Sequence, residues 1–121
     1  MCLISKDNNL QIAKEPILAY KVLNRNYISP CRGFDYSSYV NDPNKVVCDT
    51  IPYPILEHFS GHYIVEEGLH LFTDLQYAKE FTDVGISCGL IFKCEIPIGA
   101  YFILGKYGEI CTNQFKFMNE L

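Results

Sequence analysis

The residues best suited to metal chemistry are two histidines four positions apart, His58 and His62, with Glu57 beside the first. On a helix this spacing places both imidazoles on one face, as a metal pair requires. Ser60 and Gly61 break a helix between them, and no third ligand follows at a diagnostic distance. We therefore predict a structural or exposed pair and no metal site.

A cysteine nucleophile is the second chemical candidate. Cys31 lies in a predicted loop beside Arg32, and a neighbouring cation favours the reactive thiolate. A loop cysteine next to a single arginine is far more often incidental. The serine motif G-x-S-x-G and glycine-rich phosphate loops are absent. Cys88 and Cys94 fall on the apolar face of an alternating run, which predicts buried core residues.

Composition limits the protein class. The chain has 121 residues, of which 49% are hydrophobic and 20% charged, so we expect a single globular domain over residues 1–121. The net charge of −4 and dispersed Lys and Arg disfavour direct nucleic-acid binding. With no export signal, no C-x-x-C spacing and no apolar run of membrane-spanning length, we expect no membrane association, reduced thiols and a cytoplasmic location.

Alternating apolar and polar residues predict a β-rich chain. The expected strands are residues 2–5 and 10–13, joined as a hairpin, then 17–23, 45–48, 87–96, 100–104 and 110–118. Strand 17–23 is the expected central strand of the first half. Alternation puts Leu18, Tyr20 and Val22 on one face of it and Lys21 on the other.

One helix is expected after Phe72, with Thr73 as N-cap, Gln76 as its capping-box partner, and an end between residues 82 and 85. A second short helix is expected near residues 54–59. These elements predict an α+β domain, mostly antiparallel β-sheet with one or two short helices.

The long connection from Asn24 to Pro54 is rich in tyrosine. Its aromatic residues cover either the core or a ligand, and the core is favoured because aromatics supply so much of a small domain's buried area. If they are exposed, Tyr36, Tyr39 and Tyr53 are the expected anchors for a protein partner.

Residues 68–81, from Gly68 through the capped helix to Phe81, followed by the apolar strand 90–96, resemble the strand-helix-strand of ADP-ribosyltransferase folds, particularly that of poly(ADP-ribose) polymerases. The resemblance implies that Phe81 stacks on the nicotinamide of NAD and that His70 lies near its ribose. Glu109, just before the last expected strand, would be the only candidate for the catalytic glutamate.

Two positions depart from that family's pattern. The first core strand carries Tyr20 and Lys21 where the family has a His or Arg that holds the dinucleotide, and Ala78 replaces a hydroxyl that binds the carboxamide. From the resemblance we still expect Tyr20, His70 and Phe81 to bind a ligand. Because the two groups are missing, we favour a non-enzymatic protein on a degenerate form of this fold.

Short segments also resemble small proteins carried by phages and prophages: residues 2–5, 20–23, 29–30, 68–70 and 96–99. This resemblance implies a protein that acts in the cytoplasm of a bacterial host cell against a defence effector of the CRISPR type. It would act by binding a protein or ribonucleoprotein, and the acidity of the chain suits a partner with a basic surface.

The sequence thus supports two main hypotheses. The favoured one is a non-enzymatic interaction protein that needs no cofactor, which the phage resemblance implies is an inhibitor of a defence effector. The alternative is an NAD-dependent ADP-ribosyltransferase, or a pocket that sequesters NAD, an NAD-derived nucleotide or a cyclic nucleotide. A third hypothesis is RNA binding through Tyr20, Lys21, Phe115, Lys116 and Phe117. Net charge and alternation favour core positions for those aromatics.

Overall fold

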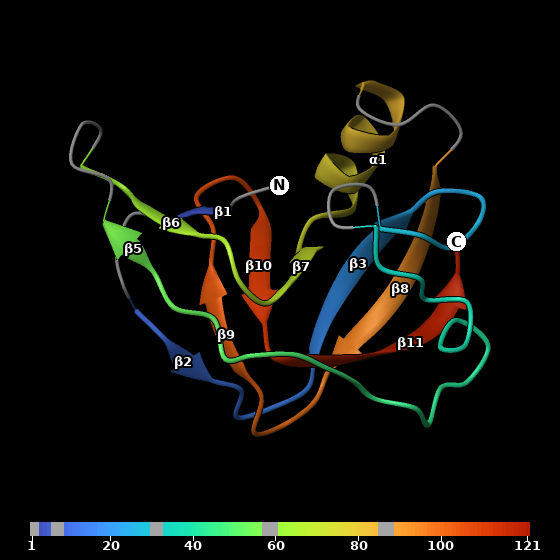
Figure 1. The fold of residues 1–121 in the computed structure, drawn as a ribbon, viewed down its shortest axis with the longest axis horizontal. Helices are drawn as coiled ribbons and strands as arrows, with labels where there is room; N and C mark the ends of the chain where they lie inside the picture. Colours follow the sequence, from blue (N-terminus) through green and yellow to red (C-terminus); the bar gives the residue numbers. More distant parts are fainter. Residues whose placement is uncertain (1–2, 6–8, 30–32, 57–60, 85–88) are drawn as a thin grey trace.

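A computed structural model describes residues 3–5, 9–29, 33–56, 61–84 and 89–121, and this part of the chain holds one helix and many short strands (Figure 1). Helix α1 spans Leu75–Val84. The strands are β1 (Leu3–Ser5), β2 (Gln11–Ile12), β3 (Ile17–Leu23), β4 (Val47–Cys48), β5 (Ile55–Leu56), β6 (Tyr63–Val65), β7 (Leu69–Phe72), β8 (Leu90–Ile96), β9 (Tyr101–Leu104), β10 (Glu109–Thr112) and β11 (Gln114–Glu120). The predicted α+β class, mostly antiparallel sheet with a short helix, is confirmed.

Two sheets carry the fold. The large sheet has the order β2-β9-β10-β7-β3-β8-β11-β4, and all of its pairings are antiparallel. The small sheet has the order β1-β6-β5 and lies at the left of Figure 1. Strand β3 lies inside the large sheet, between β7 and β8, as its apolar alternation predicts.

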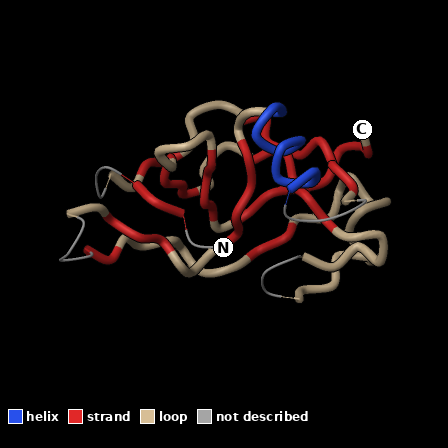
Figure 2. Tube along the Cα trace, turned by 90° about the horizontal axis from the view of Figure 1, so that it is seen from above, coloured by secondary structure: helices blue, strands red, loops and turns tan. Residues whose placement is uncertain are grey.

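The two faces of the large sheet have different covers. Val22 and Phe72 pack with Ala78 of α1 on one face. Residues of the connection between β3 and β4, including Tyr36 and Val40, join the main core cluster on the other face. Seen from above, the helix and the loops at the same end of the molecule lie on opposite sides of the strands (Figure 2).

The small sheet extends the cover on the helix side. Val65 of β6 is fully buried against Ile103 and Cys111 of the large sheet. Cys111 pairs with His70, which shares its face of β7 with Phe72. The helix and the small sheet therefore cover neighbouring parts of one face.

Helix α1 starts one residue later than its sequence signal suggests. The Asp74 carboxylate accepts a 2.8 Å hydrogen bond from the Gln76 amide, so Asp74 is the N-cap in place of Thr73. The Thr73 amide instead donates to the Gly108 carbonyl at 2.8 Å and ties the start of the helix to the turn between β9 and β10. The predicted apolar stripe is retained, because Ala78 is fully buried and Phe81 is half-buried.

The predicted N-terminal hairpin is wrong. Strand β1 pairs with β6, and β2 pairs with β9 in the other sheet. An isolated two-stranded hairpin is marginally stable in water, whereas pairing with separate sheets gives each strand packed neighbours. Ser5, for example, is buried opposite Tyr63.

Two further boundaries differ from the expected ones. The strand predicted over residues 110–118 is two strands, because β10 lies between β9 and β7 whereas β11 lies between β8 and β4. At the break, the Asn113 side chain accepts a hydrogen bond from the Tyr101 amide at 2.8 Å. Ile55 and Leu56 form strand β5 where a short helix is predicted, since they pair with β6. The rest of that predicted helix, 57–59, lies outside the described residues.

The aromatic residues of β11 are core residues. Phe115 is fully buried and Phe117 is 1% exposed, so neither can stack on RNA, and Lys21 is 7% exposed. The preference for core positions is confirmed for Phe115 and Phe117, which are therefore lost as stacking surfaces for RNA, while Tyr20 is half-buried.

Candidate functional site

The site begins where the large sheet splits. Strands β3 and β7 pair at one point only, Tyr20 with Phe72. Beyond it, β3 follows β8 as far as Leu23, while β7 follows β10 back to Leu69. The two central strands therefore diverge, and their facing edges border a gap.

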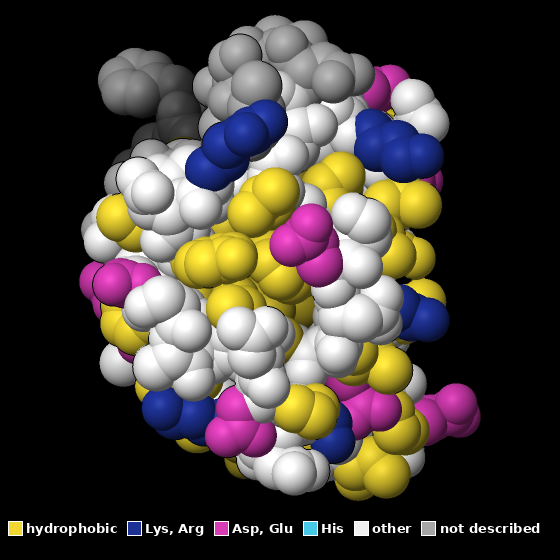
Figure 3. Space-filling model, turned by 90° about the vertical axis from the view of Figure 1, so that its right-hand side faces the viewer, with side chains coloured by type: hydrophobic (Ala, Val, Ile, Leu, Met, Phe, Trp, Pro, Cys, Tyr) yellow, Lys and Arg dark blue, Asp and Glu magenta, His cyan; other side chains and the backbone are white. Residues whose placement is uncertain are grey.

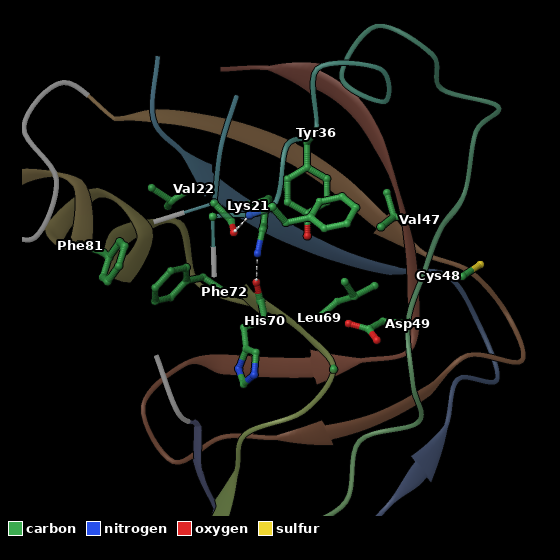
Figure 4. Close-up of a pocket in the computed structure, with 14 residues that line it drawn as sticks. Lys21, Val22, Tyr36, Val47, Cys48, Asp49, Leu69, His70, Phe72 and Phe81 are labelled. Atoms are coloured by element: carbon green, nitrogen blue, oxygen red, sulfur yellow. Dashed lines mark hydrogen bonds between the residues drawn. The ribbon is translucent and has the colours of Figure 1, made fainter. Parts of the chain in front are cut away.

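Lys21 bridges this gap. Its ammonium donates a 2.7 Å hydrogen bond to the main-chain carbonyl of His70 on the other strand (Figure 4). It also lies 5.5 Å from the ring centroid of Tyr36, within the range of a cation–π contact. The pleat of β3 places Lys21 on the same face as the fully buried Ala19 and Leu23. The segment that connects β3 to β4 covers this face.

Residues 24–29 and 33–49, here called the roof, close this side of the gap. Tyr27 adopts a positive φ of 62°, and its carbonyl accepts a hydrogen bond from the Tyr36 amide at 2.8 Å. The Tyr36 ring packs against Phe115 and Phe117 with centroid separations of 6.1 and 5.6 Å. Val40 and Val47 of the roof are also buried in the main core cluster, and the Tyr27 ring packs on Phe92 with a centroid separation of 6.1 Å, so several side chains anchor the roof to the core.

Between the roof, the diverging strands and α1 lies a cleft of about 560 Å³. Phe72 and Phe81 lie on the helix side of Lys21, and Tyr36 and Val47 lie on the other (Figure 4). Each end carries an aromatic pair: the Phe72 and Phe81 centroids are 5.5 Å apart, and those of Phe34 and Tyr36 are 4.6 Å apart. The other residues that line the cleft are Val22, Ser29, Gly33, Cys48, Asp49, Gly68, Leu69 and His70.

The His70 side chain lies among close contacts at the edge of the cleft. Its Nε2 lies 3.2 Å from the Glu66 carbonyl oxygen and 3.8 Å from the Cys111 sulfur. The Cys111 thiol donates to the Glu67 carbonyl at 3.2 Å. Gly68 permits this packing, because its φ is 106° and a Cβ there would lie 2.7 Å from the Cys111 sulfur.

Glu109 lies beside the cleft and not in its wall. It pairs with Phe72, so its side chain is on the same face as that ring. Its Oε2 atom is buried and has no hydrogen-bond partner within the described part of the chain. Burial raises the pKa of this carboxyl above its ordinary value, because desolvation disfavours the charged form.

The structure brings together part of the predicted ligand set. His70 and Phe81 line the cleft. Tyr20 lies where β3 and β7 part, and Glu109 lies beside Phe72 on the neighbouring strand. Sequence reasoning missed Lys21 and Asp49 as cleft residues. The available signal was a lysine inside a strand whose neighbouring alternate positions, Ala19 and Leu23, are apolar.

The three tyrosines expected to bind a partner have different environments. Tyr36 is 3% exposed, so it is a core residue and not a surface anchor, because the aromatic cluster of β11 packs on it. Tyr39 is half-buried, with the Lys45 ammonium 4.4 Å from its ring centroid. Tyr53 is 53% exposed and is the one of the three that is open to a partner.

The reactive candidates of the sequence are placed only in part. His58 with Glu57, and Cys31 with Arg32, lie outside the described residues, as does Cys88. Within the described ranges, no group of three His, Cys, Asp or Glu side chains could hold a metal ion. Cys94 is fully buried, as predicted, and burial raises its thiol pKa to about 12, so this thiol stays protonated near neutral pH.

No helix of the described chain is long and apolar enough to cross a membrane. Comparisons of this chain with protein-family models, curated proteins and solved structures found no match.

Proposed function

We propose that the protein binds a nucleotide in the cleft between β3 and β7. One observation carries the proposal: two aromatic pairs lie on either side of a nearly buried lysine in a single cleft. Aromatic rings offer stacking surfaces to planar bases or to nicotinamide, and an ammonium suits a phosphate. The volume of about 560 Å³ lies within the usual range of ligand sites.

Each part of a nucleotide has a counterpart in this cleft. A planar ring of the ligand would stack on Phe81 and also contact the ring of Phe72, which is paired with Phe81. The phosphate would lie near Lys21, whose ammonium is already oriented by the His70 carbonyl. Asp49, at the far end, supplies a carboxylate that accepts hydrogen bonds from ribose hydroxyls. NAD and NAD-derived nucleotides, which the ADP-ribosyltransferase resemblance implies, contain all three parts.

Binding is better supported than catalysis. A transferase needs a carboxylate positioned against the ribose to stabilise an oxocarbenium-like transition state. Among the described residues that line the cleft Glu109 is absent, whereas its partner on the neighbouring strand, Phe72, is present. The proposal is therefore a protein that holds its ligand, with transfer as the variant to be tested.

Isothermal titration calorimetry with NAD, ADP-ribose, a cyclic dinucleotide and adenosine tests the proposal. We expect saturable binding of at least one phosphorylated ligand, weakened about tenfold or more by Phe81→Ala, since stacking is worth about 1–3 kcal/mol per base. Tyr77→Ala is the matched control, because Tyr77 lies on the same helix, is 42% exposed and does not line the cleft. Absence of heat with every phosphorylated ligand would remove the proposal.

Phe81 also packs on Phe72, so its truncation can weaken the fold. Phe81→Leu keeps most of the apolar volume and removes the ring, and it should retain the fold while losing affinity. Nicotinamide release from NAD then separates a transferase from a binding protein. A transferase would release nicotinamide and lose that activity in Glu109→Gln, whereas a binding protein returns NAD intact in both forms.

A further inference from the structure

A second pocket lies where the two sheets meet, between β1, the start of β2 and the turn from β9 to β10, in the left part of Figure 1. Its volume is about 450 Å³, within the usual range of ligand sites. We call it the turn pocket, and the side chains that line it include Ser5, Asn9, Gln11, Leu104, Lys106 and Tyr107. None of these residues lines the cleft, so the two sites are separate.

Main-chain hydrogen bonds fix the walls of the turn pocket. The Lys106 amide donates to the Ile4 carbonyl at 2.7 Å, which ties the turn to the small sheet. The Gly105 amide donates to the Glu109 carbonyl at 2.7 Å and closes the turn itself. On the opposite wall, Gln11 pairs with Phe102 of β9. Because these segments are already held in place, a ligand would not have to order them on binding.

Ser5 presents a buried hydroxyl to this pocket. Its neighbour Ile4 is exposed, so the pleat of β1 turns Ser5 inward, and the residue is only 2% exposed. Among the described residues the Ser5 hydroxyl has no hydrogen-bond partner, although the residue lines the pocket. Burying a hydroxyl without a hydrogen bond costs free energy. A polar ligand in the turn pocket would supply the missing bond.

The polar groups around Ser5 indicate the chemistry of that ligand. Asn9 and Gln11 carry amides, which both donate and accept hydrogen bonds, as the serine hydroxyl does. Each hydroxyl of a saccharide also donates and accepts, so a sugar can use this set in full. An anion only accepts, and it would use the donors alone.

The pocket also has an apolar part. Tyr107 is 50% exposed and Leu104 is 46% exposed, and the Lys106 ammonium lies 5.7 Å from the centroid of the Tyr107 ring. A sugar ring has one face made of C–H groups, which packs on an aromatic ring while the hydroxyls at its edge form hydrogen bonds. Hydroxyl, amide and aromatic groups in one pocket therefore match the two kinds of surface of a sugar.

The right-hand side of the molecule has a surface of another kind. In Figure 3, hydrophobic side chains gather in the middle of this face, and charged side chains of both signs are scattered around them. An apolar surface does not hold a polyol, because each covered hydroxyl would lose its bonds to water without replacement. The turn pocket offers that replacement.

We propose that the turn pocket binds an uncharged saccharide. A sugar hydroxyl bonds to the Ser5 hydroxyl, the amides of Asn9 and Gln11 bond to its neighbours, and the C–H face of the ring packs on Tyr107. The proposal is independent of nucleotide binding, since the turn pocket and the cleft share no lining residue.

Titration of the isotope-labelled chain, followed by the NMR shifts of its main-chain amides, tests the proposal, because this method detects weak binding and locates it. The probes are glucose, galactose, mannose and N-acetylglucosamine, with inorganic phosphate as the anion probe. We expect saturable shifts of the Gly105, Lys106 and Tyr107 amides with at least one saccharide. The amide of Phe81, in the cleft, should not move.

Two variants locate the sugar within the pocket. Tyr107→Ala should weaken the affinity about tenfold, and Ser5→Ala about threefold or more, since they remove the ring and one hydrogen bond. Tyr53→Ala is the matched control, because Tyr53 is 53% exposed and lies outside the pocket. Circular dichroism checks that each variant is folded.

Three results would overturn the proposal. The first is that no saccharide shifts the amides of the turn. The second is that phosphate alone shifts them, which would make the pocket an anion site. The third is that a saccharide binds equally well to Ser5→Ala, Tyr107→Ala and the wild type, which would place the sugar elsewhere.

Discussion

The cleft and the small sheet show two ways in which this fold treats an open strand edge. At the cleft, β3 and β7 part after one pair of residues, and the gap is bridged by Lys21 and covered by the roof. At the small sheet, the outer strand β5 ends the sheet with Ile55 and Leu56, which are 46% and 45% exposed. The first edge is built around a polar contact inside the protein, and the second is left apolar and open.

The comparison teaches that the two regions suit different partners. A covered cleft with a cation and aromatic rings encloses a small ligand, because enclosure strengthens polar contacts by excluding water. A bare apolar face gains free energy only when another surface covers it. Substitutions in one of the two regions should therefore leave the other unchanged.

The largest expected difference between a buried and an exposed site is between Tyr36, in the roof of the cleft, and Tyr53, before the small sheet. Tyr36→Ala should lower the free energy of unfolding by about 3–5 kcal/mol, since it removes a buried ring that anchors the roof to Phe115 and Phe117. Tyr53→Ala, at an exposed site, should change it by less than about 0.5 kcal/mol. Urea denaturation followed by circular dichroism measures both. Equal losses would contradict the assignment of Tyr36 to the core.

This pair also shows where sequence reasoning stops. Tyr36 and Tyr53 both lie in a loop-rich segment and nothing nearby in the sequence separates them. Tyr36 is buried because β11, about 80 positions later, presents Phe115 and Phe117 to it, whereas no such partner covers Tyr53. The positions of β3 and α1 were predicted because the alternation of a strand and the 3.6-residue period of a helix are local properties of the sequence.

The candidate site was predictable only in the parts that a local pattern marks. Phe81 and His70 were found through the strand-helix-strand segment to which they belong. The role of Lys21 depends on a carbonyl 49 positions away and on the divergence of two strands that the sequence does not reveal. The N-terminal hairpin failed for the same reason, since β1 pairs with residues 63–65.

Lys21→Met tests the bridge across the split. The variant keeps the apolar stem but leaves the His70 carbonyl without its donor, which should cost about 1–3 kcal/mol of the free energy of unfolding. Lys116→Met is the control, because Lys116 forms a partly exposed 3.0 Å ion pair with Glu95 and such pairs contribute about 0–1 kcal/mol. Chemical denaturation of both variants decides the matter, and a Lys21 loss no larger than that of Lys116 would show that the bridge is dispensable.

Removing the N-cap of α1, the helix that carries Phe81, should have a smaller effect on stability. Asp74→Ala should cost about 1 kcal/mol, since it removes the acceptor for the Gln76 amide at the start of the helix that carries Phe81. Thr73→Ala should cost little, because only the main chain of Thr73 is bonded in the cap region. Thermal unfolding of the two variants compares them. A larger loss for Thr73→Ala would restore the cap that the sequence suggests.

Glu109→Gln should have the smallest effect, and its sign depends on pH. Burial raises the pKa of this carboxyl, so the folded protein binds its proton more tightly than the unfolded chain does. Wild-type stability therefore falls as pH rises above the ordinary carboxyl pKa. A neutral amide has no such penalty, so the variant should be the more stable form near pH 7 and lose that advantage in acid.

Denaturation at several pH values tests this, with the exposed Glu120→Gln as control. A variant less stable at pH 7 than in acid, relative to wild type, would mean that the Glu109 carboxylate makes a favourable contact in the folded protein, as a residue acting in the cleft would.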